Sequence, residues 1–107
     1  QASNMVGTIQ WFVYMLLCDK KTFYVGITNG VSTRILQHLN KQNISTKNFQ
    51  KLQIVYLEKY DDKFQAAKRE KQLKGWSHAK KQKLIDGKLG INACNELVEV
   101  ISEELNL

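Results

Sequence analysis

Residues 11–27 read WFVYMLLC-DKKT-FYVGI, and this stretch decides the fold. The eight apolar residues at 11–18 do not alternate with polar ones, which is typical of a short strand buried on both faces. A polar break at 19–22 follows, and a second apolar run at 23–27 suits an antiparallel partner strand. The sequence therefore predicts a β-hairpin around which the rest of the chain packs.

Tyr14 and Tyr24 fall on the two strands of this hairpin. Because side chains alternate along a strand, the two tyrosines share a face only in some registers. A register with Tyr14 opposite Gly26 satisfies this condition and leaves Gly26 where another group can approach the backbone closely. Tyrosines in strands are most often amphipathic core residues, so a structural role stays open beside a functional one.

Apolar spacing predicts the elements that follow the hairpin. Residues 31–39 carry an apolar residue every four positions, which indicates a helix with one face on the sheet. Residues 40–50 are polar and are expected to form a loop. Residues 52–59 have the apolar content of a third strand.

Capping residues place two further helices. Asp61 or Asp62 can cap a helix that runs to about residue 74, where Gly75 is expected to end it. Ser77 can cap a short basic helix that ends near residues 86–87.

Charge is distributed unevenly along a chain of 107 residues, which is the size of one domain. Residues 1–91 carry a formal charge of +10, whereas residues 92–107 carry −4. A basic body favours a polyanionic partner, usually nucleic acid, although a lysine-rich solvated surface gives the same balance. The acidic segment 92–107 is expected to be a helix that packs on the body, repels DNA from one face, or mediates a homodimer or a contact with a protein partner.

Cysteine usage and hydropathy indicate the compartment. Cys18 and Cys94 lack the paired spacing of a zinc site and are too few for a disulfide framework, which favours a reducing, cytoplasmic setting. No apolar stretch approaches the roughly 20 residues that a membrane helix needs. Residues 1–4 precede Met5, are expected to be a remnant of cloning, and are left out of the fold prediction.

Glu70 interrupts the apolar stripe of the predicted helix at 63–74, on the same face as Leu73. A carboxylate in that position faces the body of the protein, where an unpaired charge is costly. It therefore needs a cation, either a metal ion, an arginine or both. A structural ion pair with Arg34 or Lys74 is the alternative.

Arg34 and His38 lie four residues apart on the predicted helix at 31–39 and share one face of it. A bare pair of this kind is also common at a solvated helix edge.

Together these residues resemble the GIY-YIG nuclease family, in its small standalone branch. Tyr14, and Tyr24-Val25-Gly26 after it, are similar to the paired motif of that family. Arg34 follows on the next helix, and a glutamate follows on a helix after a third strand. The run REKQLKGWS at 69–77 is the specific part of the resemblance, which covers about residues 10–88. The resemblance implies an α/β (α+β) fold with a three-stranded antiparallel sheet flanked by helices, to which this chain adds a C-terminal helix.

The resemblance also implies hydrolysis of a phosphodiester bond with one divalent metal ion, Mg²⁺ or Mn²⁺. Carried over by position, Glu70 is the metal ligand and Arg34 holds the scissile phosphate. Tyr14 and Tyr24 line the attacking side, one of them as general base, and His38 assists a tyrosine. A free tyrosine has a pKa of about 10 and is a poor base at neutral pH, so the base needs Arg34 and the metal, or His38, beside it.

Basic residues after the glutamate are expected to contact nucleic acid. Lys74, Lys80 and Lys81 are candidates for phosphate contacts, and Trp76 either stacks on a base or fills core. His78 stands where close relatives often carry arginine. The resemblance implies a DNA endonuclease, and because the sequence has no helix-hairpin-helix pattern and no Cys/His cluster, little sequence specificity is expected of it.

Two other functions fit the same sequence. A non-catalytic nucleic-acid-binding protein on this scaffold would bind in a salt-sensitive manner without Mg²⁺-dependent cleavage. An interaction module that uses its acidic last helix would associate with a partner and be indifferent to nucleic acid.

Overall fold

A computed structural model describes residues 9–87 and 92–105 of the chain, so the expectation for residues 1–4 lies outside the described part. The elements in chain order are β1 (Trp11–Cys18), β2 (Thr22–Thr28), α2 (Val31–Leu39), β3 (Leu52–Tyr60), α3 (Lys63–Lys74), α4 (His78–Gly87) and α5 (Asn95–Glu104). The predicted hairpin, third strand and helices are all present, with bounds within a residue or two of those expected except for the last helix, which was expected over residues 92–107 and spans Asn95–Glu104.

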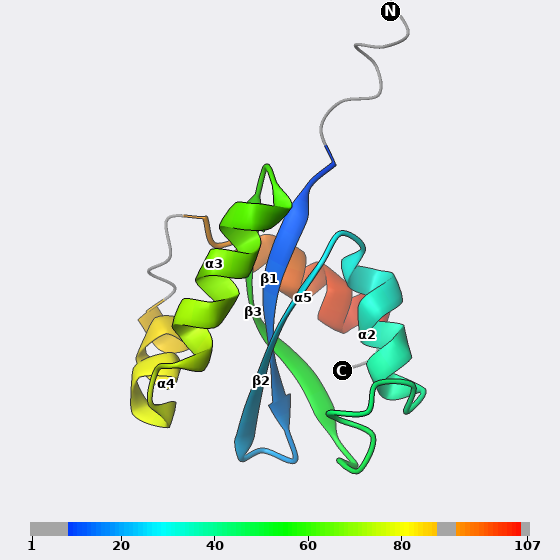
Figure 1. Ribbon diagram of the computed structural model, residues 1–107. Helices are drawn as coiled ribbons and strands as arrows, with labels where there is room; N and C mark the ends of the chain where they lie inside the picture. Colours follow the sequence, from blue (N-terminus) through cyan, green and yellow to red (C-terminus); the bar gives the residue numbers. More distant parts are fainter. Residues whose placement is uncertain (1–8, 88–91, 106–107) are drawn as a thin grey trace, which may run out of the picture.

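The three strands form one antiparallel sheet in the order β2-β1-β3, with β1 in the centre (Figure 1). This position explains the unbroken apolar run of β1, because both of its faces are covered. Four successive residues of β1, Val13, Tyr14, Met15 and Leu16, are fully buried. Tyr14 pairs with Gly26 and Leu16 with Tyr24, which is the predicted register.

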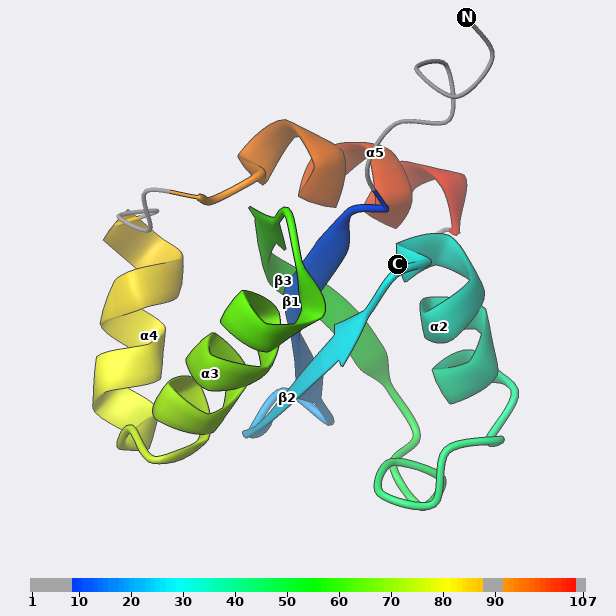
Figure 2. The same cartoon turned by 45° about the horizontal axis from the view of Figure 1, so that its top comes forward.

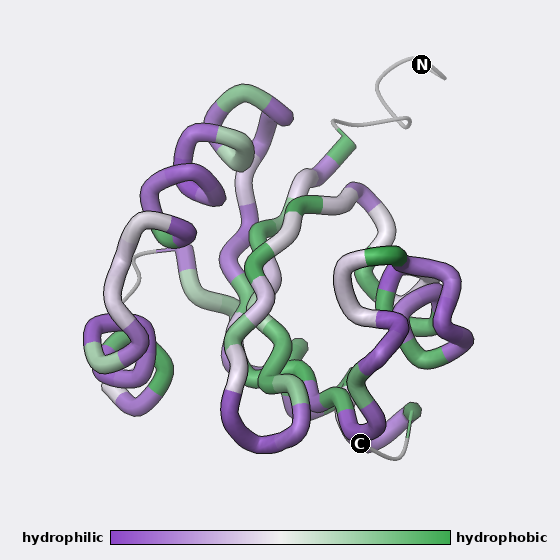
Figure 3. The backbone as a smooth tube through the Cα atoms, turned by 60° about the horizontal axis from the view of Figure 1, so that its bottom comes forward, coloured by the Kyte–Doolittle hydropathy of each residue, from purple (hydrophilic) through white to green (hydrophobic). Residues whose placement is uncertain are grey.

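The helices cover the two faces of the sheet. One core cluster joins β1 and β3 to α2 and α5 through Ile35 and Ile101, and a second joins the opposite face to α3 and α4 through Leu73 and Leu84. Figure 2 shows α2 and α3 on either side of the edge strand β2. Hydrophobic residues run along the strands, whereas α3 and α4 are largely hydrophilic (Figure 3). None of the helices within residues 9–87 and 92–105 is long and apolar enough to cross a membrane.

The turn between β1 and β2 requires an unusual backbone. Asp19 and Lys20 have φ angles of 51° and 62°, the left-handed region that favours glycine. The Asp19 carboxylate accepts hydrogen bonds from the backbone N–H of Gln50 (2.9 Å) and of Lys51 (2.7 Å), which ties the hairpin tip to the start of β3.

The predicted helix caps are confirmed. Asp62 precedes α3, and its side chain accepts from the backbone N–H of Gln65 at 2.8 Å. Ser77 precedes α4, and its hydroxyl accepts from the backbone N–H of Lys80 at 3.1 Å. Gly75 ends α3 as expected, but with a right-handed φ of −81°, so other residues can adopt its backbone.

The acidic C-terminal segment packs on the body. Residues 92–94 lie along the outer edge of β3, with the N–H of Lys59 donating to the carbonyl of Asn92 at 2.9 Å and the N–H of Cys94 donating to the carbonyl of Leu57 at 2.8 Å. This pairing covers part of a sheet edge that would otherwise expose unpaired backbone groups. Helix α5 then packs against β3, with Ile101 buried and the four glutamates exposed.

Candidate active site

The hairpin brings Tyr14 and Tyr24 together on the face that α2 covers. Their ring centroids are 6.1 Å apart. Gly26 lies directly under the Tyr14 phenol, because a Cβ built at position 26 would come within 2.5 Å of both Cζ and Oη of Tyr14. The close approach predicted for Gly26 is therefore made by Tyr14 itself.

His38 links this pair to α2 and to the loop that follows the helix. The Tyr14 hydroxyl and His38 Nε2 are 2.8 Å apart, and the other ring nitrogen, Nδ1, lies 2.6 Å from Thr46 Oγ1. All three side chains are fully buried. The His38 ring centroid also lies 5.1 Å from that of Tyr24, edge to face. Both ring nitrogens thus have a hydrogen-bond partner, as a buried imidazole requires.

Burial shifts the titration of both members of this hydrogen bond. Desolvation and the neighbouring Tyr24 raise the pKa of Tyr14 well above its usual range, although Arg34 acts in the opposite direction. Burial, with a further contribution from the positive charge of Arg34, lowers the pKa of His38 to about 4. At neutral pH, therefore, Tyr14 is a neutral phenol and His38 a neutral imidazole.

Arg34 completes the group from the first turn of α2. Its Nη1 donates to the backbone carbonyl of Ile27 at 3.3 Å, and its Nε donates to Oε1 of Gln37 at 3.1 Å. The side chain is half-buried and close enough to Tyr14 and His38 to lower the pKa of each. Tyr14, Tyr24, Arg34 and His38 therefore form one cluster, which we call the tyrosine cluster.

Glu70 is not joined to the tyrosine cluster. It lies on α3, whose buried residues Ala66 and Leu73 pack on the opposite face of the sheet. Its carboxylate pairs with the Lys74 ammonium at 3.4 Å and remains 22% exposed. This ion pair is one of the two structural alternatives expected from the sequence. Contacts in the described part of the chain do not connect Glu70 with Arg34, so their predicted convergence stays a prediction.

The described residues can offer a metal ion one carboxylate ligand, that of Glu70, and no larger set of ligands. The described residues contain no group of three or more His, Cys, Asp or Glu side chains that could hold an ion. The Glu70 side chain is 22% exposed, and the Lys74 side chain that pairs with it is 55% exposed. Such a carboxylate suits Mg²⁺, which keeps most of its water and is bound through one or two carboxylates together with substrate phosphates.

The residues predicted to contact nucleic acid differ in exposure and in the contacts that they make within the protein. Lys74 and Lys80 are exposed and Lys81 is half-buried. Trp76 packs against the α3 side of the core, with Lys80 Nζ 4.2 Å and the Arg69 guanidinium 5.2 Å from its ring centroid. Of the two roles predicted for Trp76, these contacts favour packing in the core over stacking on a base.

His78 is also engaged in the structure. Its ring stacks on Phe23 with centroids 4.5 Å apart, and its Nε2 donates to the backbone carbonyl of Lys21 at 2.9 Å. It fastens the start of α4 to the hairpin.

A buried carboxylate on β3 was not among the predicted site residues. Glu58 is 1% exposed and accepts hydrogen bonds from the hydroxyls of Tyr56 (2.6 Å) and Tyr60 (2.7 Å) and from Nε and Nη2 of Arg69 (2.9 and 3.0 Å). Burial opposes its ionisation, but these donors hold the pKa of Glu58 below its usual range. The spacing Tyr-x-Glu-x-Tyr, which places all three on one face of a strand, was the signal available in the sequence. Thr46 was missed as well, and its loop offers no such signal.

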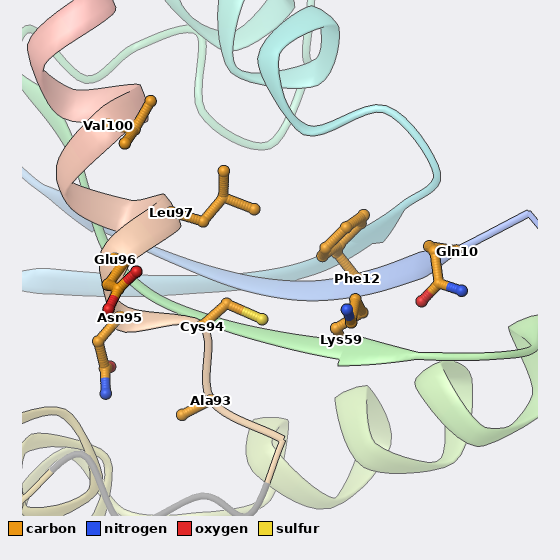
Figure 4. Close-up of a pocket in the computed structure, with 9 residues that line it drawn as sticks. All are labelled: Gln10, Phe12, Lys59, Ala93, Cys94, Asn95, Glu96, Leu97 and Val100. Atoms are coloured by element: carbon orange, nitrogen blue, oxygen red, sulfur yellow. The ribbon is translucent and has the colours of Figure 1, made fainter.

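A hollow of about 830 Å³ lies apart from the tyrosine cluster, between the N-terminal half of α5 and the strands β1 and β3 (Figure 4). Its walls include Phe12, Lys59, Cys94 and Leu97. The four residues of the tyrosine cluster do not line it.

The sheet order, the flanking helices and the tyrosine pair define the class of small α+β domain that the sequence predicted. Residues 10–83 match the GIY-YIG catalytic domain, and the chain belongs to that family. A UPF0213 protein of Staphylococcus saprophyticus is 37% identical over 75 residues, which cover 69% of this chain and 92% of that protein. A UPF0213 protein of Natronomonas pharaonis is 32% identical over 80 residues, covering 74% and 94%.

A solved structure has the same fold. The solution NMR structure of a UPF0213 protein from Bacillus halodurans superimposes with a TM-score of 0.50 at 28% identity, covering 77% of this chain and 88% of that one. The GIY-YIG domain is generally a nuclease fold, and nucleases that carry it are generally dependent on a divalent metal ion.

Proposed function

We propose that this protein is a metal-dependent endonuclease that hydrolyses phosphodiester bonds of DNA with little sequence specificity. The observation that carries the proposal is the tyrosine cluster, in which two phenols, a guanidinium and a neutral imidazole share one side of the sheet edge. The family match supports the same chemistry independently.

Tyr14 and Tyr24 differ in solvent exposure, and we assign them different roles on that basis. Tyr14 is fully buried under α2, whereas Tyr24 is half-buried and lies on the edge strand. We therefore assign Tyr24 to the position that contacts the attacking water. Tyr14 stands behind it, within hydrogen-bond distance of Nε2 of His38, whose Nδ1 is bonded to Thr46. We assign the proton of the first bond to the Tyr14 hydroxyl, so that Nδ1–H of His38 donates to Thr46 Oγ1.

Arg34 is the phosphate-binding group. Phosphoryl transfer builds negative charge on the non-bridging oxygens, and a positioned guanidinium stabilises that charge. Its hydrogen bonds to the Ile27 carbonyl and to Gln37 leave part of the guanidinium fork free for a phosphate oxygen. A bound divalent ion, held by Glu70, would add positive charge at the scissile phosphate and leaving oxygen.

The test is cleavage of single-stranded, duplex, flap and junction DNA with Mg²⁺ or Mn²⁺. Arg34→Lys and Tyr24→Phe should each lower the rate at least about 100-fold, because each removes a contact made to the reacting groups. Glu70→Gln should abolish the metal-dependent cleavage. Glu99→Gln, an exposed glutamate of α5, is the matched control and should cleave normally. Cleavage that survives Glu70→Gln would exclude Glu70 as the metal ligand.

A non-catalytic nucleic-acid-binding protein is the second candidate. The observation in its favour is that Glu70 lies on the helix over the opposite face and pairs with Lys74. This candidate predicts salt-sensitive DNA binding by the wild type, with no cleavage of any substrate in the panel at any metal concentration.

A further inference from the structure

Phe64 stands out among the exposed side chains. It is the second residue of α3 and is 87% exposed, and it is the aromatic member of the set of large apolar side chains exposed in the described structure. Single exposed apolar residues are common and need no function. Two further observations suggest a function for this exposed ring: the residues around Phe64, and its position near one end of the sheet.

The outer face of α3 is basic around this ring. Phe64, Lys68 and Lys71 are spaced i, i+4 and i+7 and are all exposed, so they form one outward stripe opposite the buried Ala66 and Leu73. We call these three residues the α3 stripe. Over its whole length α3 carries five basic residues and a single acidic one.

The two acids that precede Phe64 are occupied elsewhere. Asp62 caps α3 through the backbone N–H of Gln65, and Asp61 accepts from the side-chain amide of Gln10 at 3.4 Å. They lie before the first turn, whereas both lysines of the α3 stripe follow Phe64 down the helix. The stripe itself is therefore free of acidic side chains.

The other aromatic candidate for stacking on a base is not available. Lys80 and Arg69 both lie over the ring of Trp76, which is half-buried against the core. The Phe64 ring, by contrast, is 87% exposed. Base stacking on a protein surface needs an open aromatic ring beside positive charge, and Phe64 meets that requirement.

Phe64 and Arg34 lie at the same end of the sheet. Thr28 at the end of β2 pairs with Phe12, which in turn pairs with Lys59 near the end of β3. Arg34 bonds to the carbonyl of Ile27 at that end of β2, and α3 begins just after β3. The helices α2 and α3 cover opposite faces of the sheet, so Phe64 and Arg34 share an end of the sheet without being in contact.

We propose that the α3 stripe binds an unpaired segment of the DNA substrate, with Phe64 stacked on one base and Lys68 and Lys71 on the adjacent phosphates. This inference rests on the proposed function and specifies its substrate as DNA with a single-stranded portion next to the cleavage site. A duplex keeps its bases stacked on each other, so it cannot use Phe64 in this way.

Binding to a fluorescently labelled oligonucleotide, measured in EDTA by anisotropy, tests the inference without cleavage. Phe64→Ala should weaken binding of a 20-nucleotide single strand by about tenfold, the usual loss for one stacked base, and leave binding of the matching duplex unchanged. Phe64→Trp should restore the affinity. Val100→Ala removes an apolar side chain that is 49% exposed on the acidic helix α5, and it should change neither affinity.

The salt dependence separates stacking from charge. Lys68→Ala and Lys71→Ala should each reduce the slope of log K against log salt by about 0.7 for the single strand, whereas Phe64→Ala should leave the slope unchanged. An equal loss for single strand and duplex, or no loss at all with Phe64→Ala, would overturn the inference. Because these measurements need no cleavage, selective binding by a protein that never cleaves would refute the proposed nuclease and leave the α3 stripe standing.

Discussion

The phenol of Tyr14 occupies the space that a side chain at Gly26 would fill. The two residues are paired across β1 and β2, and a Cβ at position 26 would lie 2.5 Å from both Cζ and Oη of Tyr14. Gly26, the glycine of the second tyrosine motif, thus leaves the space that the Tyr14 phenol of the first motif occupies. The two halves of the motif depend on each other through packing as well as through chemistry.

Gly26→Ala should therefore destabilise the protein and displace Tyr14 from His38. Overpacking at a rigid, buried site costs about 1–3 kcal/mol in the free energy of unfolding, measured by urea denaturation. Gly75→Ala is the matched control, because its backbone is right-handed and the nearest atom to its Cβ is 3.5 Å away. Equal stability of the two variants would show that Tyr14 can move without cost.

The pH dependence of stability should report the buried His38. Its pKa falls from 6.5 to about 4 on folding because the ring is buried near Arg34, so the unfolded chain takes up a proton first. The stability is complete above pH 6.5 and decreases as the pH falls toward 4, by roughly 2–3 kcal/mol. In His38→Gln the free energy of unfolding should depend less on pH over this interval. An unchanged slope between pH 6.5 and 4 would place the titrating group elsewhere.

Thr46 should fix the orientation and tautomer of His38. Thr46→Val keeps the shape of the side chain but leaves Nδ1 without a partner in a buried site, which should cost about 1–3 kcal/mol of stability. Thr46→Ser should restore most of it. The ring ¹⁵N shifts of His38 measure the tautomer directly, with a protonated Nδ1 expected in the wild type. The proposed proton path from Tyr14 to His38 would be wrong if Nε2 carried the proton.

The sequence predicted the hairpin and its register because both follow from local patterns. The apolar run from Trp11 to Cys18 is typical of a buried central strand, and the observed pairing of Tyr14 with Gly26 is a register that puts both tyrosines on one face. The caps of α3 and α4 were predictable for the same reason, since Asp62 and Ser77 act within three residues of themselves.

The contacts between distant segments could not be predicted in this way. The hydrogen bond between Arg69 and Glu58 joins α3 to β3, and Thr46 reaches His38 from a loop without periodicity. The position of Glu70 illustrates the same limit. Its spacing with Leu73 predicted an inward-facing carboxylate, and in the structure Glu70 is half-buried and paired with Lys74. Periodicity does not say which face of the sheet the helix covers.

Lys20→Gly should stabilise the hairpin. Both central residues of the turn have positive φ, which is the geometry of a type I′ turn that prefers Asp-Gly. Relief of the left-handed strain at Lys20, less the extra entropy of glycine in the unfolded chain, should add about 0.5–1 kcal/mol. Lys21→Gly lies outside the left-handed pair and should instead destabilise, so a gain for both would point to an effect of lysine charge.

Arg69→Met should be among the most damaging substitutions at a partly exposed position. It leaves the Glu58 carboxylate, which is 1% exposed, without its bidentate cation, and a broken buried ion pair costs about 3–5 kcal/mol. In the wild type the pKa of Glu58 is lowered, so the contribution of the pair is present above pH 4.5 and is lost only as the pH falls through the lower value in the folded state. In Arg69→Met the buried carboxylate should take up a proton more readily, and the deficit in the free energy of unfolding should shrink between pH 7 and 4. Lys68→Met, an exposed neighbour on α3, should change stability by no more than about 0.5 kcal/mol. A deficit that is independent of pH would mean that lost packing of the arginine, rather than the unpaired charge of Glu58, causes the damage.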